Sequence, residues 1–173
     1  MTQTAEFTPA QIANFFLDKG KNEGIAIENL KLQKLVYIAY GWSLAVLDIK
    51  LFDEPIEAWK HGPVIPSLFH EFKHFRKAPI TQSALDIDWS DLEGRLKPAQ
   101  INITDEKQAV VLNKVWDVYK IFTGWELRAR THEQDTPWTR VYAPDENHHI
   151  RDEDVREHFV QKINDLIEAA HAA

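Results

Sequence analysis

Apolar residues recur at the three- and four-residue spacing of a helix face in several segments of the chain. The longest such segment runs from about residue 30 to residue 47. Lys31, Lys34 and Tyr37 lie on its polar side. The apolar or small side is formed by Leu32, Leu35, Val36, Ala39, Trp42, Ser43 and Val46. This pattern predicts an amphipathic helix at the centre of the fold.

A capping signal predicts a helix near the N-terminus. Thr8 and Gln11 have the spacing of a capping box, and Pro9 suits the first helical position because its missing N–H costs nothing there. Gly20 is the residue type that commonly follows the last turn of a helix. We therefore expect a helix over about residues 9–20.

Similar signals mark the second half of the chain. Thr104-Asp105-Glu106 supplies a cap and first-turn acids for a helix that begins there, and Thr123 with Glu126 forms a capping box. A last helix is expected from about residue 152 to residue 169. Its apolar positions are Val155, Phe159, Ile163, Leu166 and Ile167.

The segments between these helices are less regular. Residues 50–60 favour a small extended element or β-hairpin, and either Pro63 or Pro66 can open the helix that follows. Residues 79–103 lack a helical period and predict a long surface excursion, and residues 132–149 predict a loop. The expected fold is mainly α: a single domain over residues 1–173 with about five to seven helices.

Composition and charge limit the location and the kinds of partner that we expect for the chain. The chain of 173 residues is 44% hydrophobic, which predicts a folded domain, and it has no Cys, which suits a reducing cytoplasm. Neither a signal peptide nor a membrane-spanning run is evident, so we expect a cytoplasmic protein without a membrane partner. The net charge of −7 argues against nucleic acid as a partner.

One pattern raises the possibility of a zinc peptidase. His70, Glu71 and His74 fit H-E-x-x-H, in which two histidines on one helix face bind zinc and the glutamate acts as general base. A third ligand is missing at the expected place, because position 80 is Ile, and Lys73 and the nearby Arg76 would repel a dication. We therefore predict that these histidines are exposed, that Phe72 faces the core, and that the chain has no metal site.

Other catalytic patterns are also absent from the sequence. There is no G-x-S-x-G nucleophile elbow, no glycine-rich phosphate loop and no catalytic Cys. The sequence thus predicts neither an enzyme nor a cofactor.

Two longer blocks carry a resemblance to a known family. LKLQKLVYIAYGWSLAV (residues 30–46) and LFDEPIEAWKHGPVIPSLFHEF (residues 51–72) resemble the Panacea domain, which includes SocA-like and phage-associated GepA-like proteins. A later T-H followed by P-W, at Thr131-His132 and Pro137-Trp138, is similar to the family's second landmark. The resemblance spans about residues 28–165.

The resemblance implies a function in a toxin–antitoxin system. It implies an antitoxin that neutralises a cognate toxin, encoded by a neighbouring gene, through direct protein–protein binding, without catalysis. The alternative that it implies is a proteolytic adaptor that delivers the toxin to the Clp protease.

The motif residues are the candidates for a binding site. Polar members of the block can contact a partner or form a buried network, and both readings stay open. The candidates are Gln33, Lys34, Tyr37, Trp42, Glu57, Trp59, Lys60, His61, Gly62, Pro63, Pro66, Thr131, His132 and Trp138.

Overall fold

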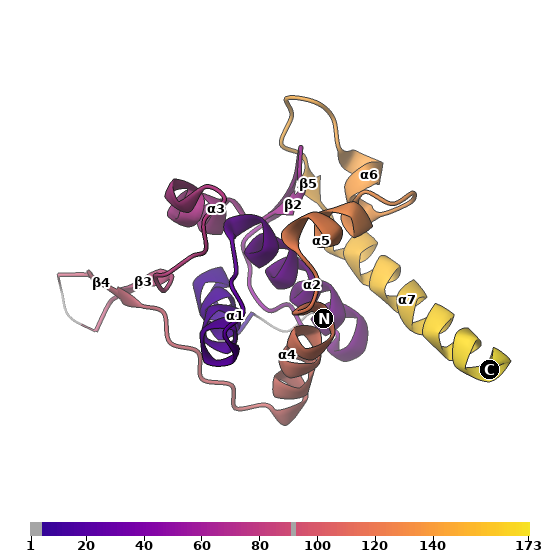
Figure 1. Cartoon of the computed structure of the whole chain (residues 1–173), viewed down its shortest axis with the longest axis horizontal. Coiled ribbons are helices and arrows are strands. Elements are labelled where there is room, and N and C mark those ends of the chain that lie inside the picture. The colour runs from indigo at the N-terminus through magenta and orange to yellow at the C-terminus, as the bar shows by residue number, and fades with distance from the viewer. Residues whose placement is uncertain (1–4, 91–92) are drawn as a thin grey trace.

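Helix α2 (Asn29–Leu47) is the centre of the fold, and the other helices pack around it (Figure 1). The computed structural model describes residues 5–90 and 93–173. In these residues the chain forms seven α-helices, so the predicted mainly α fold is confirmed. Besides α2 they are α1 (Pro9–Glu23), α3 (Pro66–Phe72), α4 (Glu106–Tyr119), α5 (Gly124–Thr131), α6 (Pro137–Val141) and α7 (Asp152–Ala172). The strands are β1 (Ile56–Trp59), β2 (Gly62–Val64), β3 (Leu85–Asp88), β4 (Arg95–Pro98) and β5 (His149–Ile150).

Helix α2 is buried on nearly every side, so the prediction of an amphipathic helix is wrong. It packs against α7, α4, α5, α1 and β2, and Lys31, Lys34 and Tyr37 are as buried as its apolar residues. Each lysine instead donates to a backbone carbonyl. Lys31 Nζ donates at 2.7 Å to the backbone oxygen of Lys120. Lys120 is the C-cap residue of α4, and the negative end of the helix dipole favours a cation there. Val46, expected on the buried side, is exposed near the end of the helix.

Helix α1 begins as predicted and ends later. The Thr8–Gln11 capping box is present in both directions, with Pro9 as the first helical residue. The helix passes through Gly20 and ends at Gly24, which has the left-handed conformation (φ 69°). Gly20 is needed for another reason: a Cβ there would lie 2.7 Å from the carbonyl oxygen of Ile25, too close for any side chain.

A small antiparallel sheet has the strand order β2-β1-β5. The hairpin pairs Glu57 with Val64 and Trp59 with Gly62, which confirms the predicted β-hairpin, although it lies over residues 56–64. Pro66 then opens α3. Helix α6 lies in the segment predicted to be a loop, residues 132–149, and strand β5 begins at its last residue; the sequence did not reveal either element.

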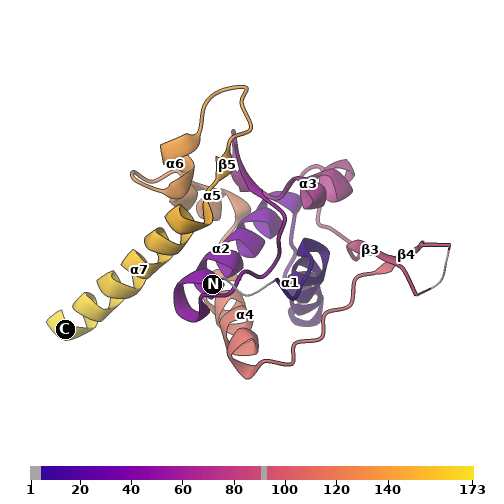
Figure 2. The same ribbon diagram turned by 180° about the vertical axis from the view of Figure 1, so that it is seen from behind.

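The segment predicted as an irregular excursion contains a second hairpin, β3–β4. It projects from the body of the molecule on the side opposite the C-terminal end of α7, as both ribbon views show (Figures 1 and 2). The side chain of Asn14 in α1 holds its base: Oδ1 accepts from the Ala84 N–H at 2.7 Å, and Nδ2 donates to the oxygens of Ala84 and Ala99. Leu85, Ile87 and Leu96 remain exposed, so the surface location is confirmed.

Helices α4 and α5 begin where the caps predict. Asp105 accepts from the N–H groups of Lys107 and Gln108, and the Thr123–Glu126 capping box is formed. Helix α7 runs to Ala172, a little beyond the predicted end, and its second half leaves the core, with Leu166 64% and Ile167 49% exposed. No helix in the part of the chain that the structure describes is long and apolar enough to cross a lipid bilayer.

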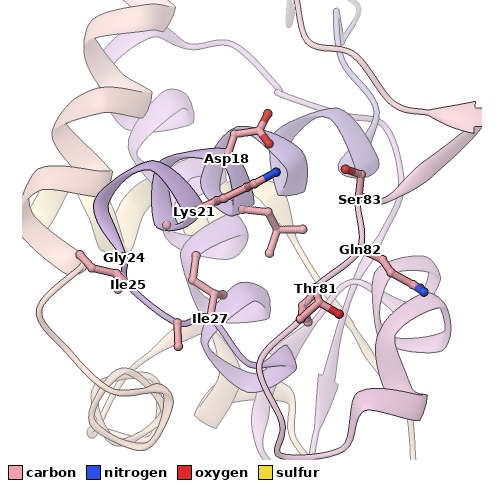
Figure 3. Close-up of a pocket in the computed structure, with 12 residues that line it drawn as sticks. Asp18, Lys21, Gly24, Ile25, Ile27, Thr81, Gln82 and Ser83 are labelled. Carbon is pink, nitrogen blue, oxygen red and sulfur yellow. The ribbon is translucent and has the colours of Figure 1, made fainter.

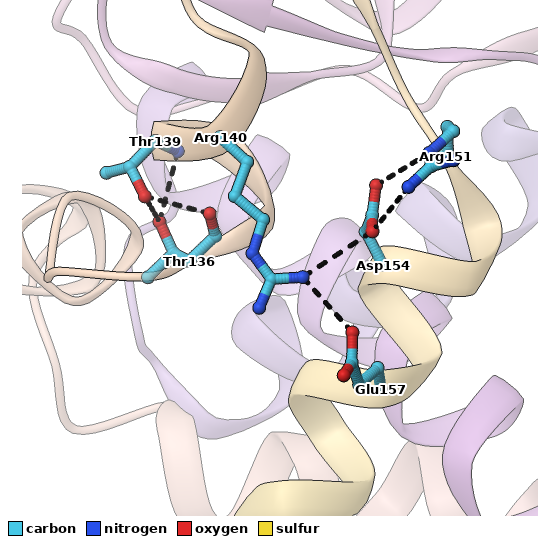
Figure 4. A network of polar contacts seen from close by, with 6 residues as sticks. All are labelled: Thr136, Thr139, Arg140, Arg151, Asp154 and Glu157. Carbon is cyan, nitrogen blue, oxygen red and sulfur yellow. Dashed lines mark hydrogen bonds and ion pairs between the residues drawn. The ribbon is translucent and has the colours of Figure 1, made fainter.

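A polar network fastens α6 to the start of α7 (Figure 4). The buried carboxylate of Asp154 receives Arg151 Nε and Nη2, both at 2.9 Å, on one side. On the other side Arg140 Nη1 reaches Asp154 at 3.5 Å and Glu157 at 3.1 Å. Pairing with Arg151 lowers the pKa of Asp154, so this anchor stays charged at neutral pH.

Candidate functional site: a basic, aromatic cleft

The H-E-x-x-H residues do not share one regular helix. Helix α3 ends at Phe72, and His74 belongs to the short 3-10 helix η1 (Lys73–Phe75) that follows. Both histidines are exposed and Phe72 is buried, as predicted. The Glu71 carboxylate accepts the Leu85 N–H at 2.6 Å, so it helps to fix the β3 strand. Among the described residues no group of three potential ligands could hold a metal ion.

The hairpin β1–β2 is held by side chains from α2. Gln33 pairs with the backbone of Ile65, since Oε1 accepts the Ile65 N–H at 2.8 Å and Nε2 lies 3.5 Å from the Ile65 oxygen. Lys34 Nζ donates to the oxygen of Pro63 at 2.9 Å. Two polar residues of the motif therefore form buried contacts that fix the passage from β2 into α3.

The second landmark holds the other end of the same hairpin. Trp138 Nε1 donates to the Trp59 oxygen at 2.7 Å, and His132 Nε2 lies 3.3 Å from the Lys60 oxygen. The rings of His132 and Trp138 lie against each other at an interplanar angle of 37°, with centroids 3.8 Å apart. The two parts of the sequence that resemble the family thus meet in space, and the second part fixes the backbone of the first.

Gly62 allows this close approach. Its φ of 102° lies in a region that suits glycine, and a Cβ there would lie 2.6 Å from Thr131 Oγ1 and 3.0 Å from Lys34 Nζ. Thr131 Oγ1 in turn donates to the Arg128 oxygen. Any side chain at position 62 would therefore force the side chains of Thr131 and Lys34 to shift, in addition to the strain of the positive φ.

Four candidates are used elsewhere. Tyr37 and Trp42 both pack against the ring of Phe159 in α7, and Trp42 Nε1 donates to Tyr119. Glu57 accepts from Trp59 Nε1 at 2.7 Å. Pro66 is the first residue of α3. The structure therefore does not bring these four into one site with the others.

A cleft of about 520 Å³ opens beside the hairpin, between α2, α3 and the start of α5. Gln33, Lys34, Trp59, Lys60 and His61 of the candidate set line it. The structure also adds residues that the sequence did not single out as a site: Asn29, Phe69, Lys73, Arg76, Lys77 and Trp125. Lys34 of α2 and the basic residues Lys73, Arg76 and Lys77, on and after η1, therefore meet at this cleft.

Burial shapes the charges at the cleft. Lys34 is fully buried, and this burial, together with the positive charge of Arg128, lowers the pKa of its ammonium to about 7. Burial and the charges of Arg128 and Lys60 also lower the pKa of His61, whose Nδ1 accepts from Arg128 Nε at 3.2 Å. The exposed Lys60, Lys73, Arg76 and Lys77 surround these groups, so the cleft presents positive charge near neutral pH.

A second hollow of about 380 Å³ lies between α1, the α1–α2 turn and residues 80–83 (Figure 3). Asp18 and Lys21 bring one charge of each sign to its edge, and Gly24, Ile25 and Ile27 lie along one side. None of the candidate motif residues lines it. The cleft beside the hairpin is therefore the better candidate site.

The Gln33 bridge can be tested by removing its polar atoms. We expect Gln33→Leu to lower the free energy of unfolding by about 1–3 kcal/mol, because the buried Ile65 N–H loses its acceptor. Urea unfolding followed by circular dichroism measures the change. Gln161→Leu, on the exposed face of α7, is the matched control, and equal stability of the two variants would contradict the role given to Gln33.

Comparison with known proteins places the chain in a family. The family model described as antitoxin SocA-like, Panacea domain, matches residues 32–139, which is most of the chain. The chain belongs to this family. The matched range runs from α2 to α6 and so contains the hairpin and both groups of side chains that fix it.

A curated relative supports the same family. Antitoxin SocA from Caulobacter vibrioides (strain NA1000 / CB15N) is 41% identical over 73 residues, which is 42% of this chain and 39% of that protein. The match thus spans about two fifths of the relative's length. No solved structure matches the chain.

Proposed function

We propose that the chain is a cytoplasmic antitoxin that neutralises a cognate toxin protein by direct binding. Membership in the SocA-like Panacea family carries this proposal. The cleft supports it, since the family region builds a hairpin whose backbone is held from several sides, beside an opening lined by cations and aromatic rings. These groups can donate hydrogen bonds, pair with anions and stack, which is the chemistry of an interface.

The candidate contacts are the cleft residues whose side chains are not used to hold the fold. Lys60 and His61 project from the turn between β1 and β2, and Trp59 forms part of the wall. Aromatic and basic residues of this kind commonly dominate the binding energy of interfaces. Gln33, Lys34, Gly62, Pro63, Thr131, His132 and Trp138 would instead fix the shape of the surface.

Co-expression tests the proposal. The product of the neighbouring gene is expressed alone, where we expect growth arrest, and together with the chain, where we expect growth to recover. Affinity purification of the tagged chain is expected to bring down the toxin at a defined ratio. Persistent arrest together with no co-purification would exclude the proposal.

The same experiment separates the alternative mechanism. An adaptor that delivers the toxin to the Clp protease needs that protease, so growth recovery would disappear in cells that lack the Clp unfoldase. Direct neutralisation predicts that recovery persists in those cells, with the toxin level unchanged by the chain.

A further inference from the structure

The cleft concentrates positive charge in an acidic chain. The net charge is −7, yet the exposed cations Lys60, Lys73, Arg76 and Lys77 line this opening and Glu28 is the acidic residue among the lining. Lys73, Arg76 and Lys77 are exposed on or just after η1, and Lys60 is exposed at the turn of the hairpin. Such local charge favours an occupant that carries negative charge.

The walls of the cleft are apolar and aromatic. Trp59 and Phe69 meet edge to face with centroids 4.9 Å apart and form one wall, with Val64 and Leu30 beside them. On another side Trp125 is 55% exposed, and Arg128 lies over its ring at 5.3 Å. An occupant therefore gains by placing an apolar or aromatic group between these rings.

A buried amide oxygen adds a third requirement. Asn29 lines the cleft and is only 5% exposed, and its Oδ1 has no hydrogen-bond partner among the described residues. Its Nδ2 is directed at the oxygen of Phe69, 3.4 Å away. A buried acceptor without a partner is costly, so a bound group that donates an N–H would be favoured there.

We propose that the cleft binds a short acidic segment of the partner protein, with carboxylates on the basic rim, an apolar side chain between the aromatic walls and a backbone N–H on Asn29. The three requirements occur together in a peptide that alternates acidic and apolar residues. A free phosphate has no apolar group for the walls. Nucleic acid would meet the strongly negative charge of the rest of the chain. The source of the segment rests on the proposed function, whereas its chemistry rests on the cleft.

The test uses the whole chain and defined probes. A synthetic peptide of alternating Glu and Phe is titrated into the labelled protein, and the indole N–H signals of Trp59 and Trp125 are followed by NMR. A peptide with Lys in place of Glu, inorganic phosphate and a short single-stranded DNA oligonucleotide are titrated in parallel. We expect the acidic peptide alone to shift both indole signals in a saturable manner.

Charge reversal supplies the second arm. Lys73→Glu with Lys77→Glu is expected to weaken binding of the acidic peptide at least about tenfold, and more strongly at low salt, because exposed charges steer and hold the ligand. Lys107→Glu with Lys114→Glu makes the same change of net charge on the exposed side of α4 and is expected to bind normally. Asn29→Leu is expected to weaken binding without changing its salt dependence.

Several outcomes would overturn the inference. These are equal binding of the acidic and basic peptides, shifts caused by phosphate or DNA instead of the peptide, or unchanged affinity of the Lys73/Lys77 double variant. The proposed function is refuted by a different result: the acidic peptide binds to the cleft, but the chain neither binds nor neutralises the toxin. If the toxin binds the wild type and the double variant equally, the proposed function stands and the inference about the cleft falls.

Discussion

Gly41→Ala is expected to lower the free energy of unfolding by about 1–3 kcal/mol, as overpacking of a core usually does. Intrinsic helix propensity predicts the opposite, a gain of about 1 kcal/mol in the middle of α2. The structure decides between them, because a Cβ at position 41 would overlap the ring of Phe159 in α7. Phe159 is itself held by the edge contacts of its ring with Tyr37 and Trp42 and has little room to move.

A double-mutant cycle tests this contact. Phe159→Ala alone is expected to lower the free energy of unfolding by about 3–5 kcal/mol, because it removes a buried aromatic ring from the core. The double variant should lose less free energy of unfolding than the sum of the two single losses, because the new methyl group then occupies the space freed by the ring. We expect a coupling energy of about 1 kcal/mol. Chemical unfolding gives all three values.

The helix propensity needs its own control. Ala109→Gly in α4 calibrates the difference between alanine and glycine in this chain, because position 109 is partly exposed, and a loss of about 1 kcal/mol is expected there. A Gly41→Ala variant that is more stable than the wild type would show that α7 does not pack on α2 at this point.

The stability of the chain is expected to rise by about 2 kcal/mol between pH 7 and pH 9 because of Lys34. In the folded state the pKa of this buried ammonium is lowered to about 7, whereas in the unfolded chain it has the ordinary lysine value of about 10.4. Between these values the unfolded state binds more protons than the folded state, so raising the pH favours folding. Below pH 7 both states are protonated, and the cost of the buried charge is fully present.

Lys34→Met tests the assignment. This variant should lack the rise in stability between pH 7 and pH 9, because no titratable group remains at that position. Lys114→Met, at an exposed position of α4, should keep the rise seen in the wild type. Unfolding by urea at a series of pH values measures both, and a Lys34→Met profile parallel to the wild type would contradict the buried ammonium.

Local signals predicted the starts of helices well. The Thr8–Gln11 and Thr123–Glu126 capping boxes are contacts over three residues, so the sequence contains both partners. Gly20 was misread as a helix end because the residue type does not show whether a glycine is needed for its φ angle or for a close approach. The close approach is to residues beyond the helix, and only the folded chain reveals it.

Periodicity failed where polar residues are buried by distant partners. Lys31 and Lys34 look solvent-facing in a helical projection, yet their partners are carbonyl oxygens 89 and 29 residues away. The β3–β4 hairpin was missed for the related reason that its base is paired by Asn14, from another element. Its alternation of Leu85 and Ile87 with Asp86 and Asp88 was the signal that could have revealed a strand.

The candidate site was predictable in part. The motif contains Lys34, Trp59, Lys60 and His61, which the structure places around one cleft. It also contains Tyr37 and Trp42, which pack on α7. Asn29, Phe69 and Trp125 carried no sequence signal of a site, because each comes from a different helix and they meet only when α3 and α5 dock beside the start of α2.

The manner in which the β1–β2 turn is fastened has a consequence for how the family can diversify. The turn is held through its backbone, by way of the oxygens of Trp59, Lys60 and Pro63, which Trp138, His132 and Lys34 contact from outside the sheet. The side chains at the rim, Lys60, Lys73 and Lys77, take no part in that fastening. Under the proposed function, exchange of a few rim residues would change the partner while the contacts that hold the turn, and with them the fold, stay the same.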